Sequence, residues 1–289
     1  MISTIKNNIL EIQVNDKGAE LSSIKKVGDN CEYLWQGDPA FWARKAPVLF
    51  PIVGKLMNNK YTVGKKEYIM TQHGFARDMD FTLVDQTADS LSYKLENSLE
   101  LLKKYPFSFN LIITYRIKAN ELAMSYEVSN TDVTRMWFSI GMHPGFNCPL
   151  LTGEKMEDYF ILFEKKETLN RTTLENGLLT DEEPFLDNQN ILPLSQKLFE
   201  RDVLILKGLK SQYVVLKNNK NKKQVKVDLK GFPYLGIWSK PSGAPFVCIE
   251  PWFGIASSKT SKPALKDKEG IISFLPGDVF HCQVKISID

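Results

Sequence analysis

The chain has 289 residues and carries 37 Lys and Arg against 34 Asp and Glu, which gives a formal net charge of +3 at pH 7. Its length permits a large buried core, and its near-balance of charge argues against a nucleic-acid binder recognised by bulk charge. The basic run at residues 217–223 contains no aromatic residue and is interpreted as a solvated hairpin loop. We therefore expect no nucleic-acid partner.

The cysteines and the hydropathy pattern bear on location. Four cysteines lie far apart with no C-x-x-C pair, which favours reduced thiols over a zinc knuckle or a redox motif; they are Cys31, Cys148, Cys248 and Cys282. No apolar run approaches the roughly 20 residues of a membrane-spanning helix, and the N-terminus lacks a sustained apolar segment. The sequence thus predicts a soluble cytoplasmic protein with no membrane partner.

The N-terminal third alternates apolar and polar residues with the period of two that is typical of strands. Residues 10–24 predict an opening hairpin that turns at 16–18, and residues 61–70 predict a second hairpin that turns at 63–66. Between them, Asp38–Arg44 is predicted to form a short helix, capped by Asp38 with proline at its first position.

The middle of the chain predicts an antiparallel meander. Its strands are expected at 91–95, 109–117 and 122–128, with a short connecting helix at 98–105 that begins at a capping serine and ends before a proline. Residues 164–196 are polar and poor in periodicity, and they are interpreted as a long surface excursion.

The C-terminal third again predicts short strands separated by turns. They are expected at 203–206, 213–216, 224–229, 234–238, 246–249 and 280–288. Many short strands and few helical windows predict an all-β protein, one large antiparallel sandwich or a related double-sheet fold. We expect a single domain over residues 1–289, because no internal repeat or linker divides the chain.

Three short motifs concentrate the chemistry of a chain that has only three histidines. The first, Thr71–Asp78, holds His73, Gly74 and Arg77, and the second, Gly141–Gly145, places His143 between glycine and proline. The third, Cys248–Gly254, holds Glu250 after an apolar stretch. Because strand ends that are distant in sequence can converge on one cleft, His73, His143 and Glu250 are candidates for a single site.

The order of these motifs resembles the aldose 1-epimerase (galactose mutarotase) superfamily, especially its LacX-like branch. The resemblance rests on His-Gly-Phe at 73–75, Gly-x-His-Pro-Gly-Phe at 141–146 and a strand-end glutamate at 250, and it runs over nearly the whole chain. It implies a large antiparallel β-supersandwich with few short helices. It also implies interconversion of the α and β anomers of a hexose, without a metal or an organic cofactor.

Opening a pyranose ring requires removal of the C1 hydroxyl proton and delivery of a proton to the ring oxygen, so a base and an acid must face opposite sides of one acetal carbon. By similarity Glu250 is the base, and His143 is the acid that protonates the ring oxygen. His73 would donate a hydrogen bond and stabilise charge as the ring opens. Apolar neighbours in the sequence would raise the pKa of Glu250 by partial desolvation.

The expected substrate-binding residues are less closely tied to the motifs. Lys55 falls where galactose mutarotases carry a sugar-binding arginine, and Asp202 resembles their sugar-binding aspartate. Trp238 is a candidate to stack on the sugar ring, with a core position as the alternative. Arg44 and Arg77 resemble phosphate-binding positions of hexose-6-phosphate epimerases, and local pairing with aspartates is the alternative.

Three other functions remain open at this point. Two histidines and a carboxylate also form the facial set of non-haem iron sites, although the wide sequence spacing argues against a metal. A sugar-binding protein without turnover would keep the cleft, but it would not need an acid opposite a base. A hexose-6-phosphate 1-epimerase would use the same three residues and add phosphate ligands. The expected partner is a small sugar or sugar phosphate, and the oligomeric state is left open.

Overall fold

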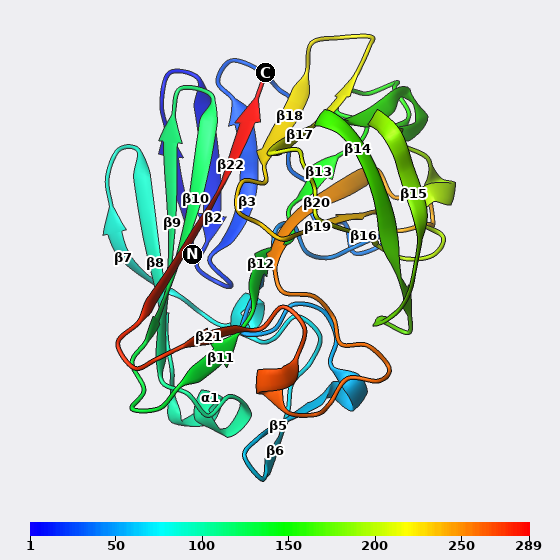
Figure 1. The fold of residues 1–289 in the computed structure, drawn as a ribbon. Helices are drawn as coiled ribbons and strands as arrows, with labels where there is room; N and C mark the ends of the chain where they lie inside the picture. The colour runs from blue at the N-terminus through cyan, green and yellow to red at the C-terminus, as the bar shows by residue number, and fades with distance from the viewer.

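The computed structural model describes residues 1–289, and antiparallel strands dominate it. The largest sheet has 15 strands and twists through the whole molecule (Figure 1). Its main path runs β4 (Val48–Leu49), β12 (Ile140–Met142), β20 (Phe246–Phe253), β19 (Tyr234–Trp238), β16 (Leu204–Lys207), β14 (Tyr159–Glu175), β17 (Tyr213–Asn218), β18 (Gln224–Asp228), β22 (Val279–Ile288), β10 (Glu121–Asn130), β9 (Phe109–Lys118), β8 (Ser90–Glu96) and β7 (Thr82–Gln86). Off this path, β13 (Gly145–Asn147) pairs with β20, and β15 (Leu178–Pro193) pairs with β14.

Smaller elements cover the ends and one face of this sheet. A three-stranded sheet, β1 (Ile2–Lys6), β2 (Leu10–Asn15) and β3 (Glu20–Lys26), lies beside the meander strands (Figure 1). Two further pairs are β5 (Lys60–Val63) with β6 (Lys66–Ile69) and β11 (Met136–Phe138) with β21 (Ile272–Phe274). The single α-helix, α1 (Leu99–Lys104), begins at Ser98, whose hydroxyl accepts a hydrogen bond from Leu101 N. The predicted all-β fold is confirmed, whereas strand β1 was not predicted.

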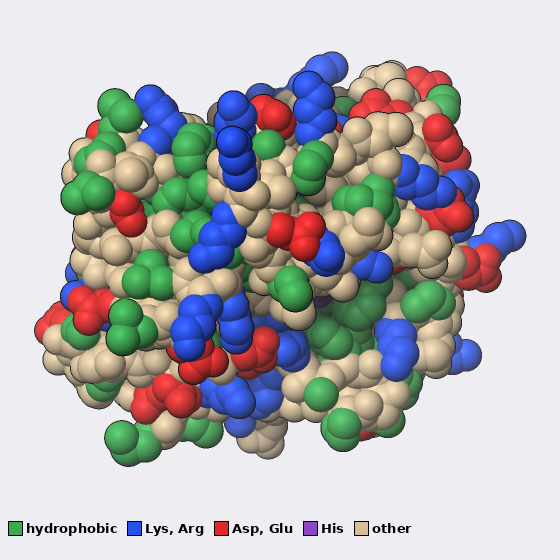
Figure 2. All heavy atoms as spheres, turned by 90° about the horizontal axis from the view of Figure 1, so that it is seen from below, with side chains coloured by type: hydrophobic (Ala, Val, Ile, Leu, Met, Phe, Trp, Pro, Cys, Tyr) green, Lys and Arg blue, Asp and Glu red, His purple; other side chains and the backbone are tan.

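One face of the molecule, seen from below, is hollowed (Figure 2). Hydrophobic side chains lie inside the hollow, and Lys and Arg side chains lie along part of its rim. None of the helices has the length and apolar character that crossing a membrane requires.

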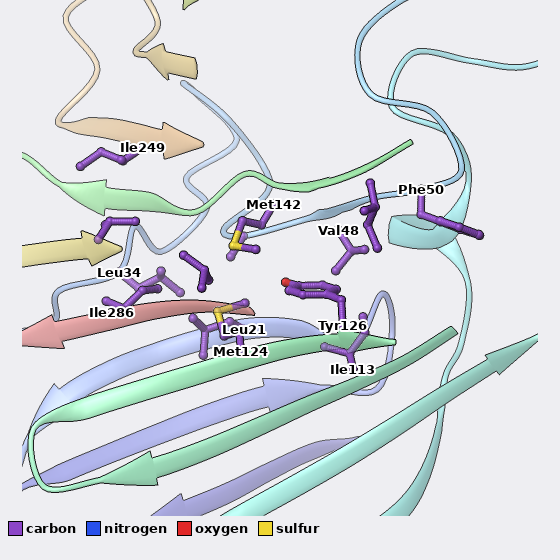
Figure 3. Packing of buried hydrophobic residues seen from close by; sticks show 14 of the residues in the cluster. Leu21, Leu34, Val48, Phe50, Ile113, Met124, Tyr126, Met142, Ile249 and Ile286 are labelled. Carbon is purple, nitrogen blue, oxygen red and sulfur yellow. The ribbon is translucent and has the colours of Figure 1, made fainter. Parts of the chain in front are cut away.

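The main core joins the meander to the strands that carry the motifs. Leu21 on β3, Met124 on β10 and Ile286 on β22 pack with residues of the central strands (Figure 3). Met142 and Ile249 are buried in the same cluster, each directly before a motif residue. Because side chains alternate across a strand, these anchors direct the following residues to the opposite face of the sheet.

Residues 164–196 lie largely at the surface as predicted, but they form regular strands, so the prediction of a segment without periodic structure was wrong. Strands β14 and β15 form a long hairpin across this region, and its two-residue turn is Asn176–Gly177. Both turn residues have positive φ, 53° and 78°, as a type I′ turn requires. Bulges interrupt the ladder at several points, and much of the hairpin is solvent-exposed, so the period of two is lost.

The helix predicted at Asp38–Arg44 is also wrong, because the segment makes only one turn. Asp38 caps it as expected, accepting a hydrogen bond from Ala40 N at 2.9 Å. The turn ends at Trp42, whose carbonyl accepts a hydrogen bond from the Trp35 indole at 2.8 Å rather than from a further helical turn. Packing of the Trp42 ring 5.5 Å from the ring of Phe246 therefore outweighs helical propensity here.

The first motif connects the hairpin of β5 and β6 to the meander through two consecutive residues in left-handed conformation. His73 has φ +68° and Gly74 has φ +72°. A Cβ at Gly74 would lie 2.2 Å from the Phe50 carbonyl oxygen. That oxygen already accepts hydrogen bonds from Phe75 N and Ala76 N, so it cannot move aside. Glycine is therefore required to hold His73 in place.

We expect Gly74→Ala to lower the free energy of unfolding by more than about 3 kcal/mol, because it adds a backbone clash to the strain of positive φ. Gly28→Ala is the matched control, since Gly28 has φ +79° and open space around it. That control should lose only about 1 kcal/mol. Urea titration of both variants measures the difference, and equal losses would show that the close approach to Phe50 is unimportant.

Candidate active site

His73 is fixed to the loop that follows β4. Its backbone N donates to Gly54 O at 3.0 Å, and Gly54 N donates to its Nδ1 at 3.2 Å. Since Nδ1 accepts, the neutral ring carries its hydrogen on Nε2. Burial lowers the pKa of His73 well below its usual value, and nearby His143, Arg77 and Arg44 act in the same direction. His73 is therefore a neutral hydrogen-bond donor.

His143 lies between β12 and β13, where its backbone N donates to Pro47 O at 3.2 Å. Aromatic rings surround its imidazole. The Trp42 ring is tilted by 31° at 4.8 Å, and the Trp238 and His73 rings meet it edge-on, each at 5.7 Å. These contacts leave one direction for Nε2, toward β20.

Glu250 is fully buried on β20, opposite Gly236 of β19. Its Oε2 lies 3.1 Å from His143 Nε2, yet neither carboxyl oxygen makes a hydrogen bond of good geometry. Trp252, two residues along the strand, lines the same pocket, and its ring covers Gly236 and Gly141 so closely that a Cβ on either would clash with it. Two glycines on flanking strands thus make room for the indole beside the carboxyl group.

Burial sets the protonation of this pair. The pKa of Glu250 is raised well above its usual value by desolvation and by the charge of Asp202, which the Trp252 indole opposes. Desolvation lowers the pKa of His143 to about 3, and Arg77 and Arg44 add to this effect. Desolvation therefore favours the protonated form of Glu250 and the neutral form of His143. In these forms the pair holds one proton, and the two groups lie 3.1 Å apart.

A pocket of about 240 Å³ contains all three residues of the motifs. Of the residues that sequence reasoning proposed for substrate binding, Arg77, Asp202 and Trp238 also line it. The remaining lining residues are Trp42, Gly54, Gln72, Leu174, Gly177, Val203, Ile205, Trp252 and Ala256. The strand ends therefore converge on one cleft.

Arg77 is the cation of this pocket. Its guanidinium donates to Gln72 O at 2.6 Å, and its buried Nε has no hydrogen-bond partner. Desolvation, together with Arg44, lowers its pKa to about 10, so the group remains charged at neutral pH. The carboxylate of Asp78 lies 3.9 Å from that Nε. It accepts a closer hydrogen bond, 2.8 Å, from the Arg44 guanidinium.

Arg44 and Lys55 do not line the pocket. Arg44 pairs with Asp78, which is the local alternative considered for it. The Lys55 ammonium donates to Asn176 O at 2.9 Å, so it fastens the tip of the β14–β15 hairpin beside the pocket. Leu179 N donates to Ser257 O at 2.9 Å and holds the same tip from its other side.

Asp202 has φ +73°, and its Oδ1 accepts a hydrogen bond from Val203 N at 2.8 Å. This is the turn geometry of an aspartate that precedes a strand, here β16, and the residue also faces the pocket. The turn and the lining role are thus compatible.

Sequence reasoning missed several pocket residues. Trp42 and Gln72 flank residues that were selected, and Leu174 and Gly177 belong to the hairpin that was not predicted. The Asn-Gly pair at 176–177 was the available signal, because it is the preferred sequence of a two-residue hairpin turn. The possible metal ligands also differ from the expected set. Cys248, and not His73, groups with His143 and Glu250, with ligand atoms within 4.8 Å of one another.

Comparisons with known proteins agree with this architecture. The sequence profile of the aldose 1-epimerase family matches residues 1–266. The whole chain is 36% identical to plasmid-encoded LacX of Lactococcus lactis, of which it covers 99%. It superposes on a galactose mutarotase related enzyme from Lactobacillus acidophilus with a TM-score of 0.96 and 36% identity, covering 100% of this chain and 97% of that one. A galactose mutarotase-like protein from Lactobacillus casei gives a TM-score of 0.93 and 32% identity over 100% of both chains.

We expect Glu250→Gln to stabilise the protein, and to do so more at pH 8 than at pH 5. Above the usual glutamate pKa of 4.5 the unfolded chain ionises while native Glu250 keeps its proton, so the free energy of unfolding falls as pH rises. Glutamine keeps the shape and removes this dependence. Denaturant titration at the two pH values measures the effect.

His143→Gln is the control of opposite sign. The pKa of native His143 is about 3, whereas the histidine of the unfolded chain takes up a proton below 6.5. Burying neutral His143 therefore lowers the free energy of unfolding more at low pH. The change relative to wild type should therefore be more favourable at pH 5 than at pH 8. A pH-independent effect in both variants would contradict the protonation assigned to the pair.

Proposed function

The chain belongs to the aldose 1-epimerase family, and from that membership we propose that it interconverts the α and β anomers of a hexose by acid–base ring opening and reclosure. The observation that carries the proposal is the 3.1 Å contact between Glu250 Oε2 and His143 Nε2 inside a pocket that also holds His73. A base and an acid are thus adjacent at the end of a cleft suited to a small ligand.

The first step is redistribution of the proton within the pair. Transfer from Glu250 to His143 Nε2 produces a carboxylate and an imidazolium, the forms that ring opening needs. Both Glu250 oxygens lack hydrogen-bond partners, so sugar hydroxyl groups that donate to them would stabilise the carboxylate. Substrate binding therefore favours the active distribution of the proton.

Ring opening then returns the pair to its resting form. The Glu250 carboxylate takes the proton of the C1 hydroxyl, His143 gives its proton to the ring oxygen, and the bond from C1 to the ring oxygen breaks to leave an open-chain aldehyde. Rotation about C1–C2 and the reverse transfers close the ring on the other face. The number of protons on the pair stays at one throughout, so turnover requires no exchange with water.

The neighbouring residues bind and orient the sugar. His73 carries its hydrogen on Nε2, because its Nδ1 accepts from Gly54 N. It would donate this hydrogen to an oxygen near the reacting carbon in place of its 3.2 Å contact with the Gln72 side-chain amide. The Trp42 and Trp238 rings give the pocket apolar surfaces on which the C–H face of a pyranose can lie. Asp202 faces the same pocket and offers a carboxylate to sugar hydroxyls.

We expect Glu250→Gln to lower the rate of anomer exchange by about 10²- to 10⁴-fold, because glutamine keeps the shape but cannot accept the C1 hydroxyl proton. Polarimetry and saturation-transfer NMR on a panel of hexoses measure the rate. Calorimetry measures sugar binding separately. A binding protein without turnover would bind the sugar but would show no anomer exchange in the wild type.

Glu167→Gln is the matched control for this test. Glu167 is also fully buried, but its carboxylate accepts hydrogen bonds from Lys210 N, Ser211 N and the Ser211 hydroxyl, away from the pocket. Its replacement should destabilise the protein and leave the exchange rate of the folded fraction near that of the wild type. Near-normal exchange by folded Glu250→Gln would refute the role proposed for Glu250.

A phosphorylated hexose is the second candidate substrate. Arg77 supports it, because this charged guanidinium lines the pocket with an unpartnered Nε and guanidinium groups bind phosphate in bidentate fashion. Arg44 gives it less support, since it is paired with Asp78 outside the pocket lining.

If the substrate carries phosphate, Arg77→Ala should lower kcat/KM for a hexose 6-phosphate by about 10-fold or more, as loss of a charged hydrogen bond implies. It should lower kcat/KM for the free hexose much less, and sulfate should compete only with the phosphorylated sugar. Arg44→Ala is the control and should change both values little. Equal losses on both substrates would favour a neutral sugar.

A further inference from the structure

Cys248 is a buried nucleophile that the proposed proton transfers do not use. It lies two residues before Glu250 on β20, so both side chains are on the same face of the strand. Its sulfur, a ring nitrogen of His143 and a carboxyl oxygen of Glu250 lie within 4.8 Å of one another. Three different ligand types therefore meet beside the pocket, which His143 and Glu250 line and Cys248 does not.

Several polar atoms of Glu250 and His143 have no hydrogen-bond partner. Both Glu250 oxygens and His143 Nδ1 are buried without a hydrogen bond. Unsatisfied buried polar atoms carry a large penalty, and a ligand that binds them removes it. The Trp252 indole is near enough to Glu250 to oppose the rise in its pKa, but Trp252 Nε1 makes no hydrogen bond of good geometry.

The spacing suits a small cation. The three ligand atoms lie no more than 4.8 Å apart, so a point between them lies within about 2.8 Å of each, and zinc binds nitrogen and oxygen at about 2.0–2.2 Å and sulfur at about 2.3 Å. Side-chain movements of roughly half an ångström would close the difference. A sulfur, nitrogen and oxygen set favours borderline-soft ions such as Zn²⁺ over Mg²⁺ or Ca²⁺.

We propose that Cys248, His143 and Glu250 form an inhibitory site for Zn²⁺ that competes with the sugar. Binding releases two protons to solvent, one from the Cys248 thiol and one from the Glu250 carboxyl group, while neutral His143 coordinates through a ring lone pair. No oxidation or reduction occurs. The fourth position faces the pocket and takes water.

The effect on activity rests on the proposed function, because the bound ion occupies the lone pairs that would move protons to and from the sugar. A zinc-loaded pocket can neither accept the C1 hydroxyl proton at Glu250 nor protonate the ring oxygen through His143. Zinc and sugar should therefore exclude each other, and removal of zinc should restore the rate.

The first test measures binding without reference to activity. Metal-free protein is titrated with ZnCl₂ by calorimetry and with CoCl₂ by absorption spectroscopy. The expected results are one zinc ion per chain and a thiolate-to-cobalt charge-transfer band. Cys248→Ala should lose that band and weaken zinc binding by about 100-fold or more, since loss of even an outer-shell partner of a metal site costs roughly 10- to 100-fold.

Cys282→Ala is the matched control, since Cys282 on β22 is the cysteine that is not buried and it does not group with His143 and Glu250. It should keep both the band and the affinity. Absence of zinc binding in the wild type, or equal binding by Cys248→Ala, would overturn the site. MgCl₂ should give no comparable binding.

The second test follows anomer exchange in each protein, relative to its own zinc-free rate. Zinc should inhibit the wild type and Cys282→Ala with a rise in apparent KM, EDTA should reverse the inhibition, and Cys248→Ala should need roughly 100-fold more zinc for the same effect. Zinc binding at Cys248 without inhibition would overturn the competition. A wild type with no exchange on any sugar before zinc is added would refute the proposed function instead, leaving the binding test to decide the site.

Discussion

The burial of Glu250 against His143 is the constraint on which the rest of the site depends. Desolvation favours the neutral form of each group, so we propose that these two side chains, 3.1 Å apart, hold one proton between them. Acid–base chemistry at neutral pH requires groups whose pKa values are moved from their usual range. The same burial opposes stability, because the unfolded chain ionises groups that the native chain keeps neutral. The surrounding core must offset this cost.

The scaffold meets that demand by placing core anchors beside the proposed acid and base. Ile249 and Met142 are buried in the main cluster, so the next residue of each strand is directed into the pocket with little freedom. Glycines supply the space that larger residues would fill, at Gly54 against Ala256 and at Gly236 under Trp252. Position thus comes from the core anchors, and room comes from glycines on the neighbouring strand and loop.

Local patterns predicted most strands and all three motifs, because period-two alternation and glycine-flanked histidines are properties of short segments. The resemblance supplied the roles of His73, His143 and Glu250. The ladder order that brings β12 and β20 together depends on long-range pairing, which no local pattern encodes. Trp42 was missed for a related reason. Its segment was predicted as a helix, but tertiary contacts with Trp35 and His143 end the turn at Trp42 and place its ring in the pocket. The β14–β15 hairpin was missed because bulges erase its period.

Lys55 shows how a matched position can serve a different task. A sugar-binding guanidinium at this point would extend into the pocket, but the ammonium here is bonded to Asn176 O in the hairpin tip. Gly177, next in the turn, allows this contact, because a Cβ there would lie 3.1 Å from Lys55 Cδ. Lys55 therefore fixes the tip of the β14–β15 hairpin and does not line the pocket. Arg77 is left as the positive charge that lines the cavity, and the choice between a neutral and an anionic sugar depends on that residue.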